Sequence, residues 1–419
     1  MNSKQDLAHR IADLRSDDPR HRGTKDKKGN ELLSNRAQYS VSMLISIILL
    51  GLIFLSCNQD SIFYDMSIEP EPRAAIIPGS PTDMVLVKNQ LFIGTRMSTT
   101  FYRYSSTDGV PGWSYINLPE GTLGDLATDG EYIYALIFRG GDPLSESVVR
   151  RFNLSDWSWD KEISSSEYSI QTIYGVQGYL FAGAQRKTDR ENFAILFHNP
   201  VADYLAETLL RVSILKGALT HSDGTIYLAT MGHGIYTFNR GIVYGPVEGT
   251  EGAAISGMLE TGGLIVAVSS DGGIYTGTAS SGFTNVSTGV NFTGAMSTWY
   301  EMGNQSVPSL LLLGIRGRGV SRTHGYRELP LQDGVPGEDI QIQIPGTEPL
   351  SSITNNAKYT ASIGVHPIET ILQIPDISRG GPLDYSLFSG DPEWQPPIFA
   401  GTTKDGLWAY RDGEWNTEE

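Results

Sequence analysis

Side chains able to do chemistry are scattered along this chain of 419 residues and show no known catalytic or metal-binding spacing. Histidine is the commonest metal ligand and general base. Zinc needs three or four converging ligands, and paired carboxylates for glycoside chemistry must face each other at a defined separation. We therefore predict no catalytic residues, no metal site and no cofactor. The histidines outside the first 42 residues have no paired or HExxH spacing: His198, His221, His233, His324 and His366.

One glycine-rich stretch, Gly314–Gly319 (GIRGRG), has the composition of a phosphate-binding loop. A phosphate-binding loop joins a strand to a helix and ends in Gly-Lys-Ser or Gly-Lys-Thr. Here Val320–Arg322 continues the chain as a strand, so we interpret the stretch as a hairpin turn.

Positive charge is concentrated in two of the predicted connecting loops. One loop contains Arg139, and the other contains Arg186, Lys187 and Arg190. Binding residues are found on loops more often than on strands, because strands carry the packing. These four residues are therefore the candidate binding loop residues for an acidic or anionic partner. The alternative is that they only keep the loops solvated.

The only cysteine, Cys57, directly follows an uncharged apolar run. Met43–Leu55 is shorter than the roughly 20 residues that span a bilayer, and it has the length of a signal-peptide core. Basic residues such as Lys28 and Arg36 lie on its amino side, as the orientation of a signal peptide requires. We predict that residues 1–56 are a leader and signal peptide.

Phe54-Leu55-Ser56-Cys57 resembles the lipobox of bacterial lipoproteins, in the relaxed form familiar from spirochaetal lipoproteins. Phe54 stands where the family usually has Leu. The resemblance implies cleavage before Cys57, acylation of its thiol and a lipid anchor in the cell envelope, on either membrane or at the cell surface. Each buried CH₂ of such an anchor contributes about 0.8 kcal/mol. A buried free thiol at the end of a transmembrane anchor is the alternative.

Charge separates the leader from the rest of the chain. The first 42 residues carry nine Lys/Arg and six Asp/Glu, whereas the remainder carries 22 Lys/Arg and 41 Asp/Glu, a net of −19. An acidic body argues against nucleic acid as a partner, because phosphates must be neutralised by cations. Residues 57–73 are polar and contain Pro70 and Pro72, so we interpret them as a tether to a single domain at 74–419.

A tetrad of apolar, strand-forming residues recurs along this domain. The third residues of successive tetrads are 39 to 47 positions apart, except for one gap of 87. Such periods built from short strands indicate the blades of a β-propeller. The doubled gap predicts a further unit at Tyr359–Ser362, so we expect eight blades, with seven as the alternative. The seven clear tetrads are Phe92–Thr95, Tyr134–Ile137, Phe181–Ala184, Tyr227–Thr230, Val266–Ser269, Leu312–Ile315 and Phe399–Thr402.

The units also share an internal order of strands and turns. A first apolar strand precedes the tetrad, a glycine turn and an aromatic strand follow it, and a fourth strand often carries Trp. We therefore predict an all-β fold with four-stranded blades, whose second strands need small residues where the sheets crowd together. Val201–Leu215 is the exception, because its apolar spacing is helical.

Three segments are similar to kelch-type and regulator-type propeller repeats. They are Tyr102–Trp113, Arg151–Trp159 and Tyr410–Trp415, in which an aromatic strand is followed by a Trp. The resemblance covers roughly residues 82–416. It implies the propeller architecture and no particular function.

Together these features predict a membrane-anchored, non-catalytic propeller that binds an envelope protein or glycan through its loops. One alternative is an envelope assembly factor similar to the eight-bladed lipoprotein of the outer-membrane protein insertion machinery. Another is an enzyme that acts on glycans, since propellers host many functions. The central channel separates the classes, because an enzyme should present clustered carboxylates with His or Tyr there and perturbed pKa values.

Overall fold

A computed structural model describes residues 77–418, except 108–109, 141–145, 177, 199–204, 209–213, 318–324, 338–362, 364–366, 391–393 and 412–413. The predicted leader, the predicted lipidation site Cys57 and the predicted tether all lie outside the described residues. No helix in the described part of the chain is long and apolar enough to cross a membrane.

The described strands form seven antiparallel sheets of four strands each, and every sheet is one blade of consecutive strands. Blade 1 comprises β1 (Pro81–Val87), β2 (Gln90–Thr95), β3 (Thr100–Thr107) and β4 (Val110–Asn117). Blade 2 comprises β5 (Thr122–Thr128), β6 (Tyr132–Phe138), β7 (Ser147–Asn153) and β8 (Ser158–Ile163). Blade 3 comprises β9 (Tyr168–Val176), β10 (Tyr179–Arg186), β11 (Asp189–His198) and β12 (Ala206–Glu207).

Blades 4 to 7 complete the domain and add two short 3-10 helices, η1 and η2, inside the last blade. Blade 4 comprises β13 (Leu215–Thr220), β14 (Ile226–Thr230), β15 (Gly234–Asn239) and β16 (Ile242–Tyr244), and blade 5 comprises β17 (Ile255–Thr261), β18 (Leu264–Ser269), β19 (Gly273–Thr278) and β20 (Gly282–Ser287). Blade 6 comprises β21 (Asn291–Trp299), β22 (Leu310–Arg316), β23 (Gly325–Gln332) and β24 (Val335–Pro336). Blade 7 comprises β25 (Ile368–Gln373), η1 (Ile377–Arg379), η2 (Tyr385–Phe388), β26 (Ile398–Thr402), β27 (Leu407–Arg411) and β28 (Glu414–Thr417).

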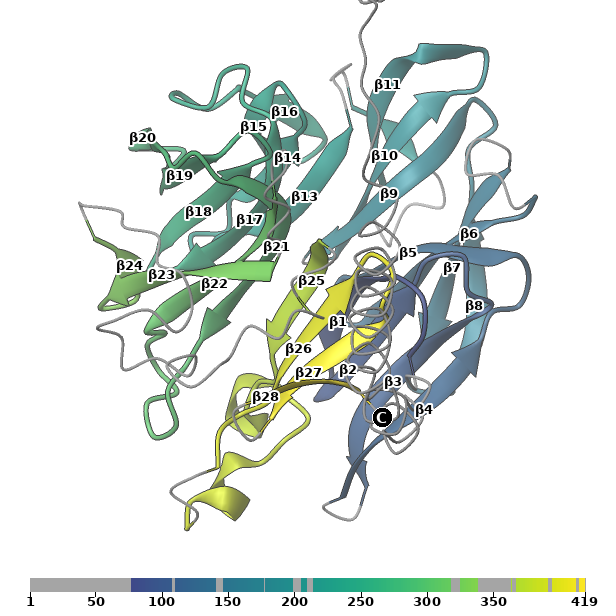
Figure 1. Cartoon of the computed structure of the whole chain (residues 1–419). Coiled ribbons are helices and arrows are strands. Elements are labelled where there is room, and N and C mark those ends of the chain that lie inside the picture. Colours follow the sequence, from purple (N-terminus) through teal and green to yellow (C-terminus); the bar gives the residue numbers. More distant parts are fainter. Residues whose placement is uncertain are drawn as a thin grey trace, which may run out of the picture. The chain divides into compact units, whose positions relative to one another are not determined.

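The blades close into a ring of seven. The first strand of each blade contacts the first strand of the next, from β1 through β5, β9, β13, β17 and β21 to β25, and β25 returns to β1. Figure 1 shows the first blade and the last blade side by side. Because β21 and β25 are in direct contact, no blade fits between them. The preference for eight blades is therefore corrected to seven, and the tetrad expected at Tyr359–Ser362 lies outside the described residues.

All seven clear tetrads are the second strands of blades, as the sequence predicts. Their glycines are explained by the neighbouring blade. A Cβ atom at Gly94 would lie 3.0 Å from the side chains of Leu123 and Leu126 in blade 2, and one at Gly401 would lie 2.7 Å from Pro81 in blade 1. Small residues in the second strand thus make room for the first strand of the next blade.

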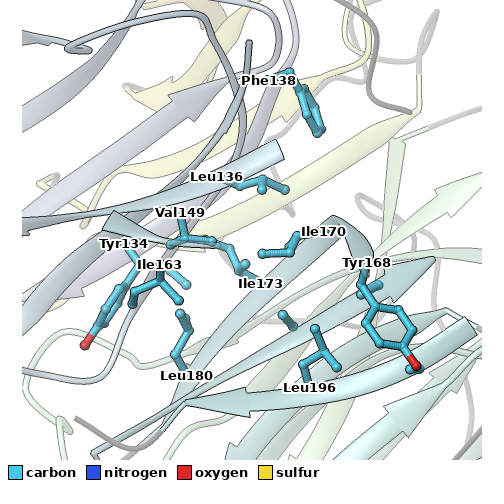
Figure 2. Close-up of a cluster of buried hydrophobic side chains, with 14 residues drawn as sticks. Tyr134, Leu136, Phe138, Val149, Ile163, Tyr168, Ile170, Ile173, Leu180 and Leu196 are labelled. Carbon is cyan, nitrogen blue, oxygen red and sulfur yellow. The ribbon is translucent and has the colours of Figure 1, made fainter. Parts of the chain in front are cut away.

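The core lies between adjacent blades rather than inside any single sheet. One buried cluster joins Tyr134, Leu136 and Val149 of blade 2 to Ile170 and Leu196 of blade 3. In Figure 2 these side chains fill the space between the two sheets, and the hydroxyl groups of Tyr134 and Tyr168 point outward from opposite ends. Alternating apolar positions on both faces of each sheet therefore stabilise the ring through inter-blade packing.

The helical expectation for Val201–Leu215 is wrong where the structure describes this segment. Ala206–Glu207 is the outer strand β12, paired with β11, and Leu215 begins β13. The pairing edge of β11 overrides the helical spacing, because strand pairing satisfies the backbone of both segments at once.

Candidate functional site

The predicted binding residue Arg139 follows β6 and is surrounded by carboxylates. Its guanidinium forms ion pairs with Glu120 at 2.7 Å, Glu146 at 2.9 Å and Glu162 at 2.9 Å. Hydrogen bonds from Arg139, and then from Arg150, lower the pKa of Glu120 to about 2. The charge of Arg139 is therefore balanced by its own domain.

The other three predicted residues lie around the β10–β11 turn, in blade 3. Arg186 lies 3.5 Å from Glu167, and Lys187 donates a hydrogen bond of 2.8 Å to the backbone carbonyl of Ser165. Arg190 accepts a hydrogen bond from Gln185 through its carbonyl oxygen. The β6–β7 and β10–β11 turns occupy equivalent positions in neighbouring blades, so the structure brings these loops to the same end of the ring. Their binding role stays a prediction.

A central channel of about 300 Å³ is lined by the first strand of every blade. Each of these strands carries a register shift near its start, as between Leu123 and Asp125 of β5 or between Ile255 and Gly257 of β17. Such β-bulges kink a strand and redirect a side chain. The bulged positions line the channel with mixed polar groups, including Thr82, Lys216 and Glu369.

Two carboxyl groups meet in this channel. Asp125 of β5 is only 8% exposed, and it accepts hydrogen bonds from the backbone N–H of Leu126 at 3.2 Å and of Ile173 at 2.9 Å. Burial, together with the charge of Asp83 and a hydrogen bond to it, raises the pKa of Asp125 well above its ordinary value. Burial likewise raises the pKa of the nearby Tyr174.

Asp125 meets the description of a perturbed group in a cavity, but its contacts are structural. Asp125 binds Asp83 of blade 1, lies in blade 2 and accepts from Ile173 of blade 3, so one side chain links three blades. Among the described residues, no three His, Cys, Asp or Glu side chains are grouped closely enough to hold a metal ion. The arrangement is suited to holding a shared proton that ties the inner strands together.

A second cavity, of about 420 Å³, lies between blade 1 and the β25–β26 connection of blade 7. We call it the blade 1–blade 7 groove. The β1–β2 turn and β3 supply Lys88, Gln90 and Arg103, and the connection supplies apolar residues that include Ile377 and Leu387. No sequence motif pointed to this groove. The only signal was the long interval before the last tetrad, which contains the connection.

The connection that forms one wall of the groove is held by its own hydrogen bonds. Asp376 caps η1 by accepting from the Ser378 N–H at 2.8 Å, and its other oxygen accepts from the Tyr385 N–H at 2.7 Å. Burial alone would raise the pKa of Asp376, but the hydrogen bonds from Ser378 and Tyr385 together outweigh burial and lower it. The Tyr385 hydroxyl donates to the carbonyl of Ile374. The wall is therefore fixed by buried contacts within the connection.

The groove displays apolar side chains to solvent. Ile377 is 47% exposed and Leu387 is 66% exposed, although both belong to this fixed connection. Phe388 beside them stacks on Trp394, with ring centroids 4.3 Å apart. Exposed apolar side chains gathered in a concavity mark binding sites more often than scattered ones do.

The opposite wall is cationic. Lys88 is exposed, and Arg103 lies with its guanidinium 4.5 Å from the centre of the Trp157 ring and hydrogen-bonds Ser114 at 3.1 Å. Neither Lys88 nor Arg103 forms an ion pair with a described residue. The side-chain oxygen of Gln90 is buried without a hydrogen-bond partner among the described residues. A buried acceptor left in this state costs free energy that a donor from a ligand would recover.

Comparisons with known proteins show the fold and no family. The sequence matches no family model and no curated protein. The structure is similar to a chain of "Crystal Structure of Mitotic Checkpoint Complex", with a TM-score of 0.53 and 11% identity over 81% of this chain and 94% of that chain. It is also similar to the "WD40 beta propeller domain of Doa1", with a TM-score of 0.48 and 11% identity over 82% of this chain and 94% of that one. The protein thus has the fold of a seven-bladed β-propeller.

Proposed function

We propose that this protein is a lipid-anchored, non-catalytic binding module of the cell envelope, whose propeller holds a protein partner through its loops. The observation that carries this proposal is the blade 1–blade 7 groove, where exposed apolar side chains are fixed on a capped connection. A closed ring keeps these side chains in place without a partner, so little ordering entropy opposes binding.

Site-specific photo-crosslinking in the intact cell envelope tests this function. A photoreactive residue at Leu387 is expected to give a discrete protein adduct, whereas one at Ile242 of blade 4, which is also exposed, is expected to give none above background. Identical adducts from both positions, or adducts from neither, would contradict the proposal. A purified full-length chain that degrades peptidoglycan or another envelope polysaccharide would instead support an enzyme.

The lipid anchor rests on the uncharged run that ends at Ser56-Cys57. Mass spectrometry of the membrane-extracted protein is expected to find a diacylated or triacylated Cys57 as the first residue. The Cys57→Ala variant is expected to keep the signal segment and to accumulate as precursor. An unmodified thiol, or a peptide that retains residues 43–56, would remove the anchor from the proposal.

The alternative of an outer-membrane assembly factor is weakened by the blade count. That alternative depended on an eight-bladed ring like that of the known lipoprotein, whereas the propeller of this protein has seven blades. A binding role in the envelope does not depend on that likeness.

A further inference from the structure

The blade 1–blade 7 groove combines three kinds of group that complement one kind of ligand. One wall is apolar and the other is cationic. Gln90 also lines the groove, and its side-chain oxygen is buried without a hydrogen-bond partner among the described residues. These groups come from opposite ends of the sequence and meet only because the ring closes.

The apolar wall sets the first requirement. Ile377 and Leu387 are exposed while their backbone is fixed by Asp376, so they remain available to a ligand. The cavity of about 420 Å³ has the size of a small-ligand pocket, roughly 300–1,000 Å³. A bulky aliphatic or aromatic side chain would remove this surface from water, at about 25 cal/mol per Å².

The charges set the second requirement. Lys88 and Arg103 have no carboxylate partner among the described residues, on a body that carries a net charge of −19 after residue 42. The one acidic residue of the groove, Asp384, caps η2 by accepting from Ser386 N at 3.0 Å and Ser386 Oγ at 2.6 Å. The charge left for a ligand is therefore positive, and it attracts a carboxylate.

The Gln90 oxygen sets the third requirement. The Gln90 side chain lines the groove, and its oxygen lacks an N–H or O–H donor among the described residues. The backbone of an extended peptide provides N–H groups at regular intervals beside its side chains. A lipid headgroup supplies the anion but no such regular row of donors next to an apolar side chain.

We propose that the blade 1–blade 7 groove binds an extended acidic peptide of a protein partner. One bulky apolar side chain packs on Ile377 and Leu387, a following Asp or Glu approaches Lys88 and Arg103, and a backbone N–H donates to Gln90. This inference rests on the proposed binding function and names the partner chemistry of the same site.

Peptide binding to the full-length protein in detergent tests the inference. The probe is a fluorescein-labelled octapeptide, GSLFDESG, and two matched peptides, GSLFNQSG and GSSSDESG, remove its charge or its apolar side chains. By fluorescence polarisation, the first peptide is expected to bind roughly tenfold more tightly than either of the others. Equal binding of the charged and neutral peptides would overturn the proposal.

Variants assign the binding to this groove. Lys88→Glu and Leu387→Ser are each expected to weaken binding of GSLFDESG roughly tenfold, and Gln90→Leu about fivefold. The control variants Lys404→Glu and Ile242→Ser change an exposed cation and an exposed apolar residue elsewhere, and they should stay within about twofold. Melting temperatures report whether each variant is folded. Wild-type affinity in folded Lys88→Glu and Leu387→Ser proteins would overturn the proposal.

Soluble dihexanoyl phosphatidylglycerol tests the lipid alternative. If this lipid binds, if Lys88→Glu abolishes its binding, and if no acidic peptide binds, then the groove takes a lipid headgroup and the peptide proposal is wrong. Crosslinking from Leu387 to an envelope protein, together with failure of every acidic peptide, would retain the binding function and reject only the acidic peptide as its ligand.

Discussion

Two regions of this propeller carry cations on an acidic domain, and they differ in what those cations contact. Around blade 2, Arg139 and Arg150 share the carboxylates of Glu120 and Glu162. In the blade 1–blade 7 groove, Lys88 and Arg103 form no ion pair with a described residue, and Arg103 contacts the Trp157 ring and Ser114. Charge that is already paired contributes to stability, whereas unpaired charge beside exposed apolar surface is available for binding.

The Asp125 and Asp83 carboxyl groups of the central channel resemble the ion pairs around blade 2, because they are already bound within the protein. Asp125 is buried, yet its oxygens are occupied by backbone N–H groups and by Asp83. A perturbed pKa therefore does not by itself separate a binding or catalytic site from a structural contact. Exposure of apolar side chains and unsatisfied polar atoms separates them better in this protein.

The largest effect is expected from Gly381→Ala, which should remove peptide binding from the blade 1–blade 7 groove and leave the ion pairs of blade 2 unchanged. A Cβ atom at Gly381 would lie 1.8 Å from the carbonyl oxygen of Pro375, so the connection must move. Binding of GSLFDESG should fall by roughly tenfold or more, and the free energy of unfolding by about 1–3 kcal/mol. The matched control is Gly390→Ala in the same connection, where a Cβ meets nothing within 4 Å. Unchanged peptide affinity in the Gly381→Ala protein would mean that the wall does not shape the groove.

Asp125→Asn tests the contact between the Asp125 and Asp83 carboxyl groups in the channel. The raised pKa means that the neutral carboxyl stabilises the fold, fully below the unfolded pKa near 4, and that this stability is lost as pH rises. An Asn keeps a donor for Asp83 and an acceptor for Ile173, and it does not ionise. The variant should therefore melt roughly 2–4 °C above the wild type at pH 8, with a smaller gain at pH 5. A variant that melts lower than the wild type at both pH values would show that ionisation of Asp125 does not destabilise the fold.

Glu120→Gln tests the ion pairs around Arg139. The ionised carboxylate stabilises the fold above its ordinary pKa of 4.5, and this stability is lost as pH falls towards about 2. Because the side chains are partly exposed, the variant should lose only about 0.5–1 kcal/mol at pH 7, and the loss should shrink in acid. Denaturant unfolding at pH 7 and pH 3 measures it. A loss that is the same at both pH values would mean that packing, and not charge, is responsible.

The smallest effect is expected from replacing Arg186, Lys187 and Arg190 together by Ser. Arg186 and Lys187 have only exposed contacts, so the melting temperature should change by less than about 1 °C. Affinity for GSLFDESG should also stay within about twofold, because this loop is in blade 3. The reverse result, in which the envelope crosslink from Leu387 disappears in this variant, would move the partner's contacts to blade 3.

Periodicity predicted the blades because each blade repeats the same packing. A residue such as Gly401 is small because the next blade touches it, and the same kind of contact recurs at the other second strands that carry a glycine. The segment Val201–Leu215 lacked this agreement, since its helical spacing competed with pairing to β11. The interval before the last tetrad also misled the blade count, because length alone does not distinguish a blade from an inserted connection.

The sequence by itself determined the all-β repeat, the second strand of every blade and the positions of the turns, because the residue pattern that marks them recurs, mostly at intervals of 39 to 47 residues. Only the tertiary structure decided that seven blades close the ring, since closure depends on contact between β1 and β25. It also decided which cationic side chains form ion pairs with carboxylates of the domain and which do not. Lys88 and Leu387 are almost 300 residues apart in the sequence, and they line one groove because ring closure brings the two ends of the domain together.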